Sequence, residues 1–426
     1  MKSFNSILSK VLETIKPTEE ELKKIENCIK EFITSLGKNI AEKKVEAEIF
    51  IGGSFAKNTV IKKEKYDVDV FLRFDKKYDT HEISSITESL LKSFKGVSTI
   101  HGSRDYFRIK IDENFLIELI PVIKAPNPSE AENITDLSFS HVKYINQNIK
   151  SKNTLDEIML AKAFCYANNC YGAESYINGF SGYSLELLIH HYGSFMKFLR
   201  AMLKVGKEKL IIDMENYYKP KKNVLIDINS SKLSSPIILV DPTYKQRNAL
   251  AALSRDTLQK FQEITKDFIN NPRTEAFERR KTDLEEIKAC AEKDKFEFIL
   301  IGTETQKQEG DVAGTKLFKF YKHLSKEISK FFLIKNNGFN YNERNAARYF
   351  FVVKNKEDIL VTGPDLKDSG NAEAFKKKHP TYFTKKGKLY SKEKFEGLIE
   401  DFIKEWKHKN KLKIKEMYIT NLEIIK

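Results

Sequence analysis

The sequence has 426 residues, 41% hydrophobic and 31% charged, and carries a formal net charge of +14. This length is enough for two to four domains, and no apolar run approaches the roughly 20 residues needed to cross a bilayer. The start of the chain lacks the apolar segment of a secretory signal, so we expect a cytoplasmic protein without a membrane partner. The charge favours a polyanionic partner, although a lysine-rich, solubilising surface explains it equally well.

The four cysteines lack the spacing of a metal site, and a large cytoplasmic chain needs no disulfide framework. We therefore expect four small, buried or semi-buried thiols, at Cys28, Cys165, Cys170 and Cys290.

The first third of the chain has the pattern of a small α/β unit with a mostly antiparallel sheet. Residues 6–36 show helical spacing, with a capping box predicted at Thr18–Glu21 and an end at Gly37. A short strand at 47–51 runs into the turn Gly52-Gly53-Ser54, where the lack of side chains lets a ligand approach the backbone. Further strands are expected at 68–74, 107–111 and 115–121, and a helix at 83–93.

The rest of the chain has two different patterns. From a predicted capping box at Thr154–Glu157 onward it is mainly helical, with helices at 184–202 and about 248–270 and an apolar run at 237–240. A strand at 296–301, a helix at 313–336 and a strand at 348–354 then predict a separate α+β domain of β-α-β order. A basic tail, 395–426, surrounds a helix that holds Trp406.

Three carboxylates are the strongest chemical signal. Asp67 and Asp69 lie two apart in a predicted strand, so they project to one face and repel each other unless a cation joins them. Glu118 lies in an apolar strand, where a charge is costly without a partner. With the Gly-Ser turn upstream, this set fits two-metal phosphoryl transfer. A lone Asp-x-Asp is more often a turn and an edge residue; the upstream turn and downstream Glu118 favour the metal site.

The sequence resembles the archaeal-type (class I) CCA-adding enzymes, which are tRNA nucleotidyltransferases. The resemblance covers about two thirds of the chain and is weaker beyond residue 270. It rests on segments in the family's order: 53–59, 67–72, 117–121, 171–174, 179–188, 192–195, Val240-Asp241-Pro242 and Arg247-Asn248. The Gly-Phe-Ser-Gly-Tyr segment at 179–183 and the Asp-Pro and Arg-Asn pairs are its most specific parts.

The resemblance implies an α+β multidomain fold. It would have a polymerase-β-type nucleotidyltransferase head at 1–135, a helical nucleotide-recognition domain at 136–270 and a C-terminal α+β, tRNA-binding body and tail at 271–426. It also implies that Asp67, Asp69 and Glu118 are catalytic metal ligands for Mg2+. The nucleotide-binding residues that it implies are Gly53, Ser54, Lys57, His141, Lys162, Tyr171 and Arg247.

Several of these residues have ordinary structural explanations. The family commonly has arginine where Lys57 stands, so a phosphate contact survives there better than a planar one. Lys162 on its apolar helix also fits a snorkelling lysine, and Tyr171 fits a core aromatic. His141 is as consistent with a satisfied core or surface histidine as with a ligand, and Arg247 could form an ion pair with Asp241.

The activity implied by the resemblance is the addition of C, C and A from CTP and ATP to the tRNA 3′ end, with release of pyrophosphate. A partial CC- or A-adding enzyme, another RNA-terminal nucleotidyltransferase and a non-catalytic tRNA-binding protein are the alternatives. We expect some of the basic elements to contact the tRNA acceptor end. The sequence does not decide between a monomer and a homodimer. These basic elements are 219–222, 376–379, 385–386 and 407–415.

Overall fold

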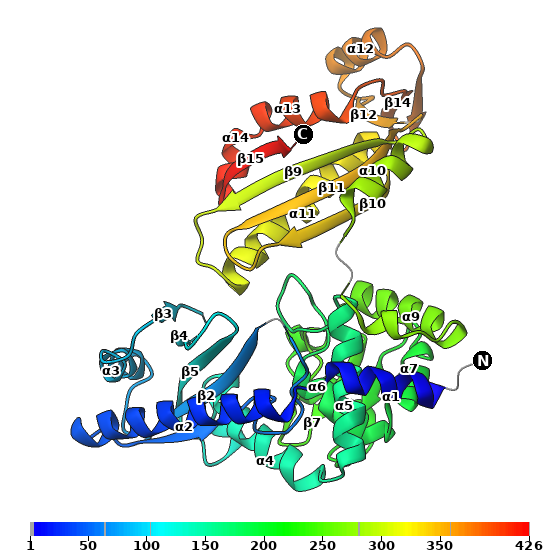
Figure 1. Cartoon of the computed structure of the whole chain (residues 1–426). Helices are drawn as coiled ribbons and strands as arrows, with labels where there is room; N and C mark the ends of the chain where they lie inside the picture. The colour runs from blue at the N-terminus through cyan, green and yellow to red at the C-terminus, as the bar shows by residue number, and fades with distance from the viewer. Residues whose placement is uncertain (1–3, 64, 103, 280–281, 358, 426) are drawn as a thin grey trace. The chain divides into compact units, whose positions relative to one another are not determined.

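A computed structural model describes residues 4–63, 65–102, 104–279, 282–357 and 359–425. The chain forms two compact units, Met1–Arg280 and Lys281–Lys426 (Figure 1). The boundary predicted at 270/271 lies ten residues before this division. The boundary predicted at 135/136 lies inside the first unit, and the separation of a head from a helical domain stays a prediction.

The helices of the first unit are α1 (Phe4–Ile15), α2 (Glu19–Glu42), α3 (Glu82–Leu90), α4 (Ser138–Asn148), α5 (Lys152–Ala167), α6 (Gly182–Tyr192), α7 (Phe195–Leu203), α8 (Val224–Asp227) and α9 (Arg255–Asn270). Its strands are β1 (Ala47–Ile51), β2 (Tyr66–Phe74), β3 (Val97–Ile100), β4 (Tyr106–Lys110), β5 (Phe115–Ile123), β6 (Leu210–Ile212), β7 (Ile237–Asp241) and β8 (Tyr244–Asn248). Short 3-10 helices lie at Pro128–Glu130, Ile134–Leu137, Lys221–Asn223, Ser230–Lys232 and Thr274–Phe277.

The second unit contains the helices α10 (Leu284–Lys293), α11 (Asp311–Phe331), α12 (Ser369–Lys378), α13 (Ile399–Lys409) and α14 (Lys411–Glu416). Its strands are β9 (Glu297–Thr305), β10 (Phe332–Tyr341), β11 (Ala346–Asn355), β12 (Ile359–Asp365), β13 (Tyr382–Lys385), β14 (Lys388–Glu393) and β15 (Ile419–Ile425).

A five-stranded sheet of order β1-β2-β5-β4-β3 organises the N-terminal part of the first unit. All neighbours are antiparallel except β2 and β5, which run parallel. The mostly antiparallel sheet predicted from the sequence is confirmed, and β3 is a strand that the prediction missed. Alternate residues of β2 and β5, such as Val70 and Ile117, are fully buried in the core against α2. The intervening polar residues therefore lie on the opposite face of the sheet.

Helix α2 is longer than predicted. Its capping box is confirmed, because the Thr18 side chain accepts the Glu21 N–H and the Glu21 carboxylate accepts the Thr18 N–H. The predicted end at Gly37 is wrong, since the helix continues to Glu42. Leu36 and Ile40 are buried on either side of Gly37, and this packing outweighs the roughly 1 kcal/mol by which glycine disfavours a helix.

The middle of the chain is mainly helical, as predicted, but the helix predicted at 184–202 is two helices, α6 and α7, separated at Gly193, where φ is +80°. Two other helices begin at different residues than predicted. Helix α5 begins at Lys152, so the capping box predicted at Thr154 is wrong. Glu157 instead accepts the backbone N–H of Phe195 from another helix, at 2.7 Å. Helix α9 begins only at Arg255, because the Ser254 side chain caps it and residues 244–248 form β8.

The second unit is built on a four-stranded sheet of order β10-β11-β9-β15, with α11 packed on it. The predicted order β-α-β misses β10 between α11 and β11. The apolar run from Phe331 to Ile334 continues the helical pattern, but the structure turns into a strand at Phe332. Trp406 lies on α13, as predicted, and is buried in the same core.

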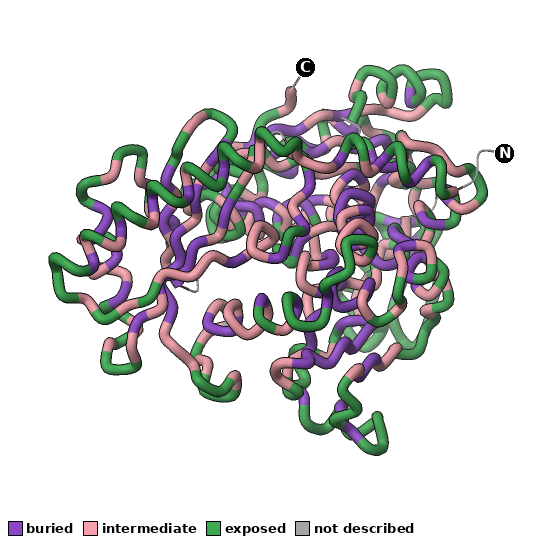
Figure 2. The backbone as a smooth tube through the Cα atoms, turned by 60° about the horizontal axis from the view of Figure 1, so that its bottom comes forward, coloured by how far each residue is buried: buried purple, intermediate pink, exposed green. Residues whose placement is uncertain are grey.

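Burial follows the elements along the chain, with exposed residues concentrated in loops and outward helix turns (Figure 2). In the described residues, no helix has the length and apolarity needed to cross a membrane. All four cysteines are free thiols. Cys165 and Cys170 are buried and Cys28 is half-buried, whereas Cys290 is exposed, contrary to prediction, on the short helix α10.

Candidate active site

The Gly-Ser turn after β1 is pressed against strand β2. Gly53 has a φ of +63°, and a Cβ atom there would lie 1.9 Å from Asp69 Oδ2. The Gly52 N–H donates to the Asp69 backbone oxygen at 2.8 Å. Only glycine adopts this conformation at this separation without strain, so the turn brings its backbone directly to the carboxylate.

The three predicted metal ligands lie on neighbouring strands. Asp69 of β2 is paired in register with Glu118 of β5, and Asp67 lies two residues earlier on β2. Side chains two apart on a strand share a face, so all three project to the same side of the sheet. Burial raises the pKa of Asp69 to about 7, with added repulsion from Glu118 and Asp67.

Two of these carboxylates already have basic partners that the sequence did not predict. Lys63 Nζ lies 3.2 Å from Asp67 Oδ1, and Arg108 Nε donates to Glu118 Oε1 at 2.8 Å. Burial raises the pKa of Glu118, and Arg108 opposes that rise. Arg108 could have been found from the alternation in β4, but its pairing with Glu118 depends on strand register.

A metal fits this site by the chemistry of its donors. Carboxylate oxygens are the ligands that Mg2+ prefers, and within the described chain the Asp69 side chain accepts no hydrogen bond and forms no ion pair. In the same described ranges, however, no three His, Cys, Asp or Glu side chains are gathered as a metal-binding group. The triad shares a face of the sheet without converging on one point.

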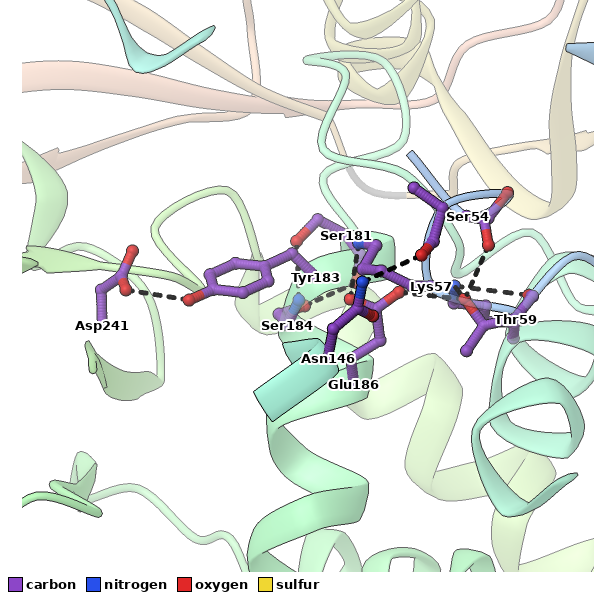
Figure 3. A network of polar contacts seen from close by, with 11 residues as sticks. Ser54, Lys57, Thr59, Asn146, Ser181, Tyr183, Ser184, Glu186 and Asp241 are labelled. Carbon is purple, nitrogen blue, oxygen red and sulfur yellow. Dashed lines mark hydrogen bonds and ion pairs between the residues drawn. The ribbon is translucent and has the colours of Figure 1, made fainter. Parts of the chain in front are cut away.

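A buried ionic cluster joins the Gly-Ser turn to helices α5 and α6 (Figure 3). Glu186 of α6 accepts from Lys57 Nζ at 2.7 Å and from Lys162 Nζ at 2.8 Å. The Thr59 hydroxyl contacts Glu186 at 3.2 Å and Lys162 at 2.7 Å. Both lysines predicted to bind the nucleotide therefore meet at one carboxylate.

The pKa values in this cluster follow from burial and pairing. Burial lowers the pKa of Lys162 to about 8, with Glu186 opposing the shift and Lys57 adding to it. Burial also acts to raise the pKa of Glu186, but the two lysines outweigh it and the net shift is downward. The sequence signal for Glu186, a charge within the apolar run 185–189, is the same as the one that identified Glu118.

Four predicted residues line one small pocket. Ser54, Asp67, Lys162 and Tyr171 share it with neighbouring residues of the turn, namely Thr59, Val60, Ile61, Lys63 and Tyr66. A Cβ atom on Gly182 would lie 2.8 Å from the Tyr171 hydroxyl and 3.7 Å from Lys162 Cε. The glycine at the start of α6 thus leaves room for both side chains.

The remaining predicted residues form a second cluster, around Asp241. His141 Nε2 lies 3.1 Å from Asp241 Oδ2, and Arg247 Nη1 donates to the same oxygen at 2.6 Å. The Tyr183 hydroxyl donates to Asp241 Oδ1 at 3.0 Å, and its ring stacks on His141 at 3.9 Å between centroids. Lys57 Nζ lies 5.9 Å from the Tyr183 ring centroid, so Tyr183, which was not predicted, connects the two clusters.

Asp241 is the charged centre of that cluster. Burial acts to raise the pKa of its carboxyl, but His141 and Arg247 hold it well below the usual range. Burial lowers the pKa of His141 despite Asp241. The ion pair between Arg247 and Asp241 considered from the sequence is present, and Arg247 Nε is buried without a hydrogen-bond partner in the described structure.

The sequence is similar to those of several known proteins. Residues 156–278 match the family model described as "tRNA nucleotidyltransferase, second domain". A CCA-adding enzyme of Methanocaldococcus jannaschii is 28% identical over 94% of this chain and 90% of its own length. The chain is thus similar to archaeal CCA-adding enzymes along nearly its whole length.

Other CCA-adding enzymes match over shorter stretches. The CCA-adding enzyme of Nanoarchaeum equitans is 40% identical over 49% of this chain, which spans about half (51%) of that relative's length. The relative from Pyrococcus abyssi is 32% identical over 63% of the chain and 60% of its own length. The similarity to CCA-adding enzymes therefore rests on matches along most of the chain and on partial matches at higher identity.

Solved structures support the fold. A crystal structure of Cid1 poly(U) polymerase has a TM-score of 0.51 at 14% identity, covering 66% of this chain and 99% of that chain. A cytoplasmic RNA terminal U-transferase has a TM-score of 0.50 at 13% identity, with 66% and 100% covered. The polymerase-β-like nucleotidyltransferase fold predicted from the sequence is confirmed.

Proposed function

We propose that this chain adds C, C and A from CTP and ATP to the 3′ end of tRNA, without a nucleic-acid template. The observation that carries the proposal is the shared face of Asp67, Asp69 and Glu118 beside the Gly53-Ser54 turn. The family names support it, since the relatives above are called CCA-adding enzymes. A cytoplasmic location and the tRNA acceptor end as partner belong to the same proposal.

In the proposed reaction, the 3′-hydroxyl of the RNA gives up its proton to solvent, and its oxygen forms a bond to the α-phosphorus of the nucleotide. The bond from this phosphorus to the leaving oxygen breaks, and pyrophosphate departs. Asp67, Asp69 and Glu118 would hold Mg2+, which when bound supplies activation of the hydroxyl and neutralisation of the phosphates. For Glu118, this requires exchange of Arg108 for the ion.

We assign the other residues to nucleotide binding. The Gly53 backbone and the Ser54 hydroxyl are placed to receive phosphate oxygens. Lys57 and Lys162 supply positive charge beside the same pocket, and Tyr171 lies against the sugar and base. His141 and Arg247 lie around Asp241 and Tyr183, and the planar donors of the Arg247 guanidinium suit a base edge.

The decisive experiment is incorporation of labelled nucleotides into tRNA that ends before C, after CC and after CCA. With Mg2+, CTP and ATP, we expect the first two substrates to be completed and the third to stay unchanged. Extension by C alone or by A alone would indicate a partial enzyme. No extension of any substrate would contradict the proposed function.

Asp69→Asn tests the role of the acidic face, because the substitution removes a charge with little change in shape. We expect incorporation to fall by at least about a thousandfold, while tRNA binding measured by filter retention stays within about twofold. Glu88→Gln, an exposed carboxylate on α3 of the same unit, is the matched control and should be fully active. Equal loss of binding and incorporation in Asp69→Asn would point to a structural role.

A further inference from the structure

Helix α7 presents a basic face that the candidate active site does not use. Its buried face packs into the core through Phe195, Phe198, Leu199 and Met202. On the exposed side, Lys197, Arg200 and Lys204 follow at spacings of three and four residues, which places them along one face of the helix. Within the described structure, none of these three forms an ion pair with a carboxylate.

This face lines an open groove of about 820 Å³. The groove continues along the loop after α7, which adds Lys207 and Lys209 and a single acidic residue, Glu208. Tyr192, Ala201, Val205, Gly206 and Leu210 complete its lining. Five basic side chains thus surround one concave surface with one opposing carboxylate.

The loop that carries Lys207 is held in place from helix α9. Arg255 donates to the backbone oxygens of Gly206 and Lys207. Gln262 donates to the backbone oxygens of Met202 at 2.7 Å and Val205 at 2.9 Å. The basic side chains of the groove therefore project from a fixed backbone rather than from a free loop.

The groove lies at one end of helix α6, and the candidate active site lies at the other. Gly182, the first residue of α6, lies beside the Tyr171 hydroxyl of the candidate active site. Tyr192, the last residue of α6, lines the groove. Eleven residues at 1.5 Å each give a separation of about 15 Å along the helix axis. Burial lowers the pKa of His191 at this same end of α6, and the charge of Lys221, from the basic segment 219–222, adds to that shift.

Stabilisation of the helix is too small an explanation for the whole groove. Cations in the last turn of α7 do interact favourably with the helix dipole, by about 0.3–1 kcal/mol each. That effect falls off within one turn, so it covers Arg200 and Lys204 but neither Lys197 nor Lys207. The charge array extends beyond the helix end, and a ligand with several negative groups would match it.

The spacing of the charges favours a polymer over a free nucleotide. From Lys197 to Lys204 the helix rises about 10 Å, which is longer than one phosphate group and fits successive phosphates. We propose that this groove, formed by α7 and the loop 204–210, binds the phosphate backbone of the RNA substrate a few nucleotides behind its 3′ end. The inference rests on the proposed function and assigns part of its substrate contact.

The test replaces Lys197, Arg200 and Lys204 together with glutamine in the full chain. We expect the KM for tRNA lacking its CCA end to rise about tenfold at 0.15 M KCl. The slope of log affinity against log salt should fall by two to three, because each phosphate contact contributes about one. The KM for CTP and kcat at saturating tRNA should stay within twofold.

The control removes three equally exposed lysines from α2 of the same unit, Lys23, Lys30 and Lys38. It carries the same change in net charge, so an effect of overall charge would appear in both variants. An unchanged KM for tRNA and salt slope in the α7 variant would overturn the inference, as would a raised KM for CTP alone. Urea unfolding midpoints check that both variants are folded.

The two proposals fail in distinguishable ways. Without incorporation by the unmodified chain, the proposed function fails, and direct tRNA binding still tests the groove. With normal incorporation and an α7 variant that behaves as the control does, the groove inference alone fails.

Discussion

At the scale of single residues, buried charges determine how the candidate site is organised. Glu186 is completely buried, and it is the only described carboxylate that contacts both Lys57 and Lys162. Without it, two ammonium groups would face each other in a desolvated interior, where an unpaired charge costs several kcal/mol. Glu186 is therefore expected to hold both lysines in position beside the pocket.

Glu186→Gln keeps the shape of the side chain and removes its charge. We expect the free energy of unfolding at pH 7 to fall by about 3 kcal/mol. The deficit should shrink by pH 9.5, because Lys162 has a lowered folded-state pKa of about 8. Above that pH the native state has released a proton that the unfolded chain still binds, so raising the pH stabilises the fold. Without Glu186 the pKa of Lys162 is lower still, so the variant gains this stabilisation from a lower pH onward and its deficit shrinks.

Urea denaturation at pH 7 and pH 9.5 measures this difference. Glu263→Gln, an exposed acid on α9, provides the control and should change stability by less than about 0.5 kcal/mol. A loss of the same size at both pH values would show that repulsion between the lysines is not its cause.

The sequence identified the acidic residues of the site better than their partners. A carboxylate within an apolar strand is conspicuous by itself, as for Glu118, because burial of a lone charge is costly. Arg108 and Tyr183 were missed because their partners, Glu118 and Asp241, lie ten and 58 residues away in the chain. Such pairs depend on strand register and helix packing, which local patterns do not contain.

At the scale of elements, strands were predicted more accurately than helix ends. Strand 47–51 matches β1, and 68–74 lies within β2, because alternating burial is a strong local signal. Helix ends depend on weaker terms of about 1 kcal/mol, such as caps and glycines. Tertiary burial overrides these terms at Gly37, whereas at Gly193 the backbone conformation itself ends the helix.

Two glycines with open surroundings separate these effects. Neither Gly37 nor Gly193 has a neighbour within 4 Å of an added Cβ atom, but Gly193 has a φ of +80° at the end of α6. Gly37→Ala should raise the free energy of unfolding by about 0.5–1 kcal/mol. Gly193→Ala should lower it by about 1 kcal/mol, because an L-residue is strained at positive φ. Urea unfolding followed by circular dichroism compares them, and changes of the same sign would contradict this account.

At the scale of the whole molecule, each core cluster of the described residues lies within one of the two units. The described core clusters of the first unit end at Phe277, and that of the second begins at Ile299. The sequence predicted a change of pattern near this place, since helical periodicity gives way to a strand at 296–301. It could not fix the boundary, because the short helix at Thr274–Phe277 belongs by packing to the core of the first unit.

Separate cores predict that the two units fold independently. Expressed alone, residues 1–279 and residues 282–426 should each show a cooperative thermal transition, because each contains a complete core of buried side chains. The far-ultraviolet circular dichroism of the two fragments, added in proportion to length, should reproduce that of the full chain within about 10%. Residues 1–200 serve as the control, because that fragment loses the part of the first core formed by Phe261 and Phe268 and should bind hydrophobic dyes as a partly folded chain does. If residues 1–279 also behave as the control does, the first unit depends on the second for its stability, and the absence of a shared core is not enough to make it independent.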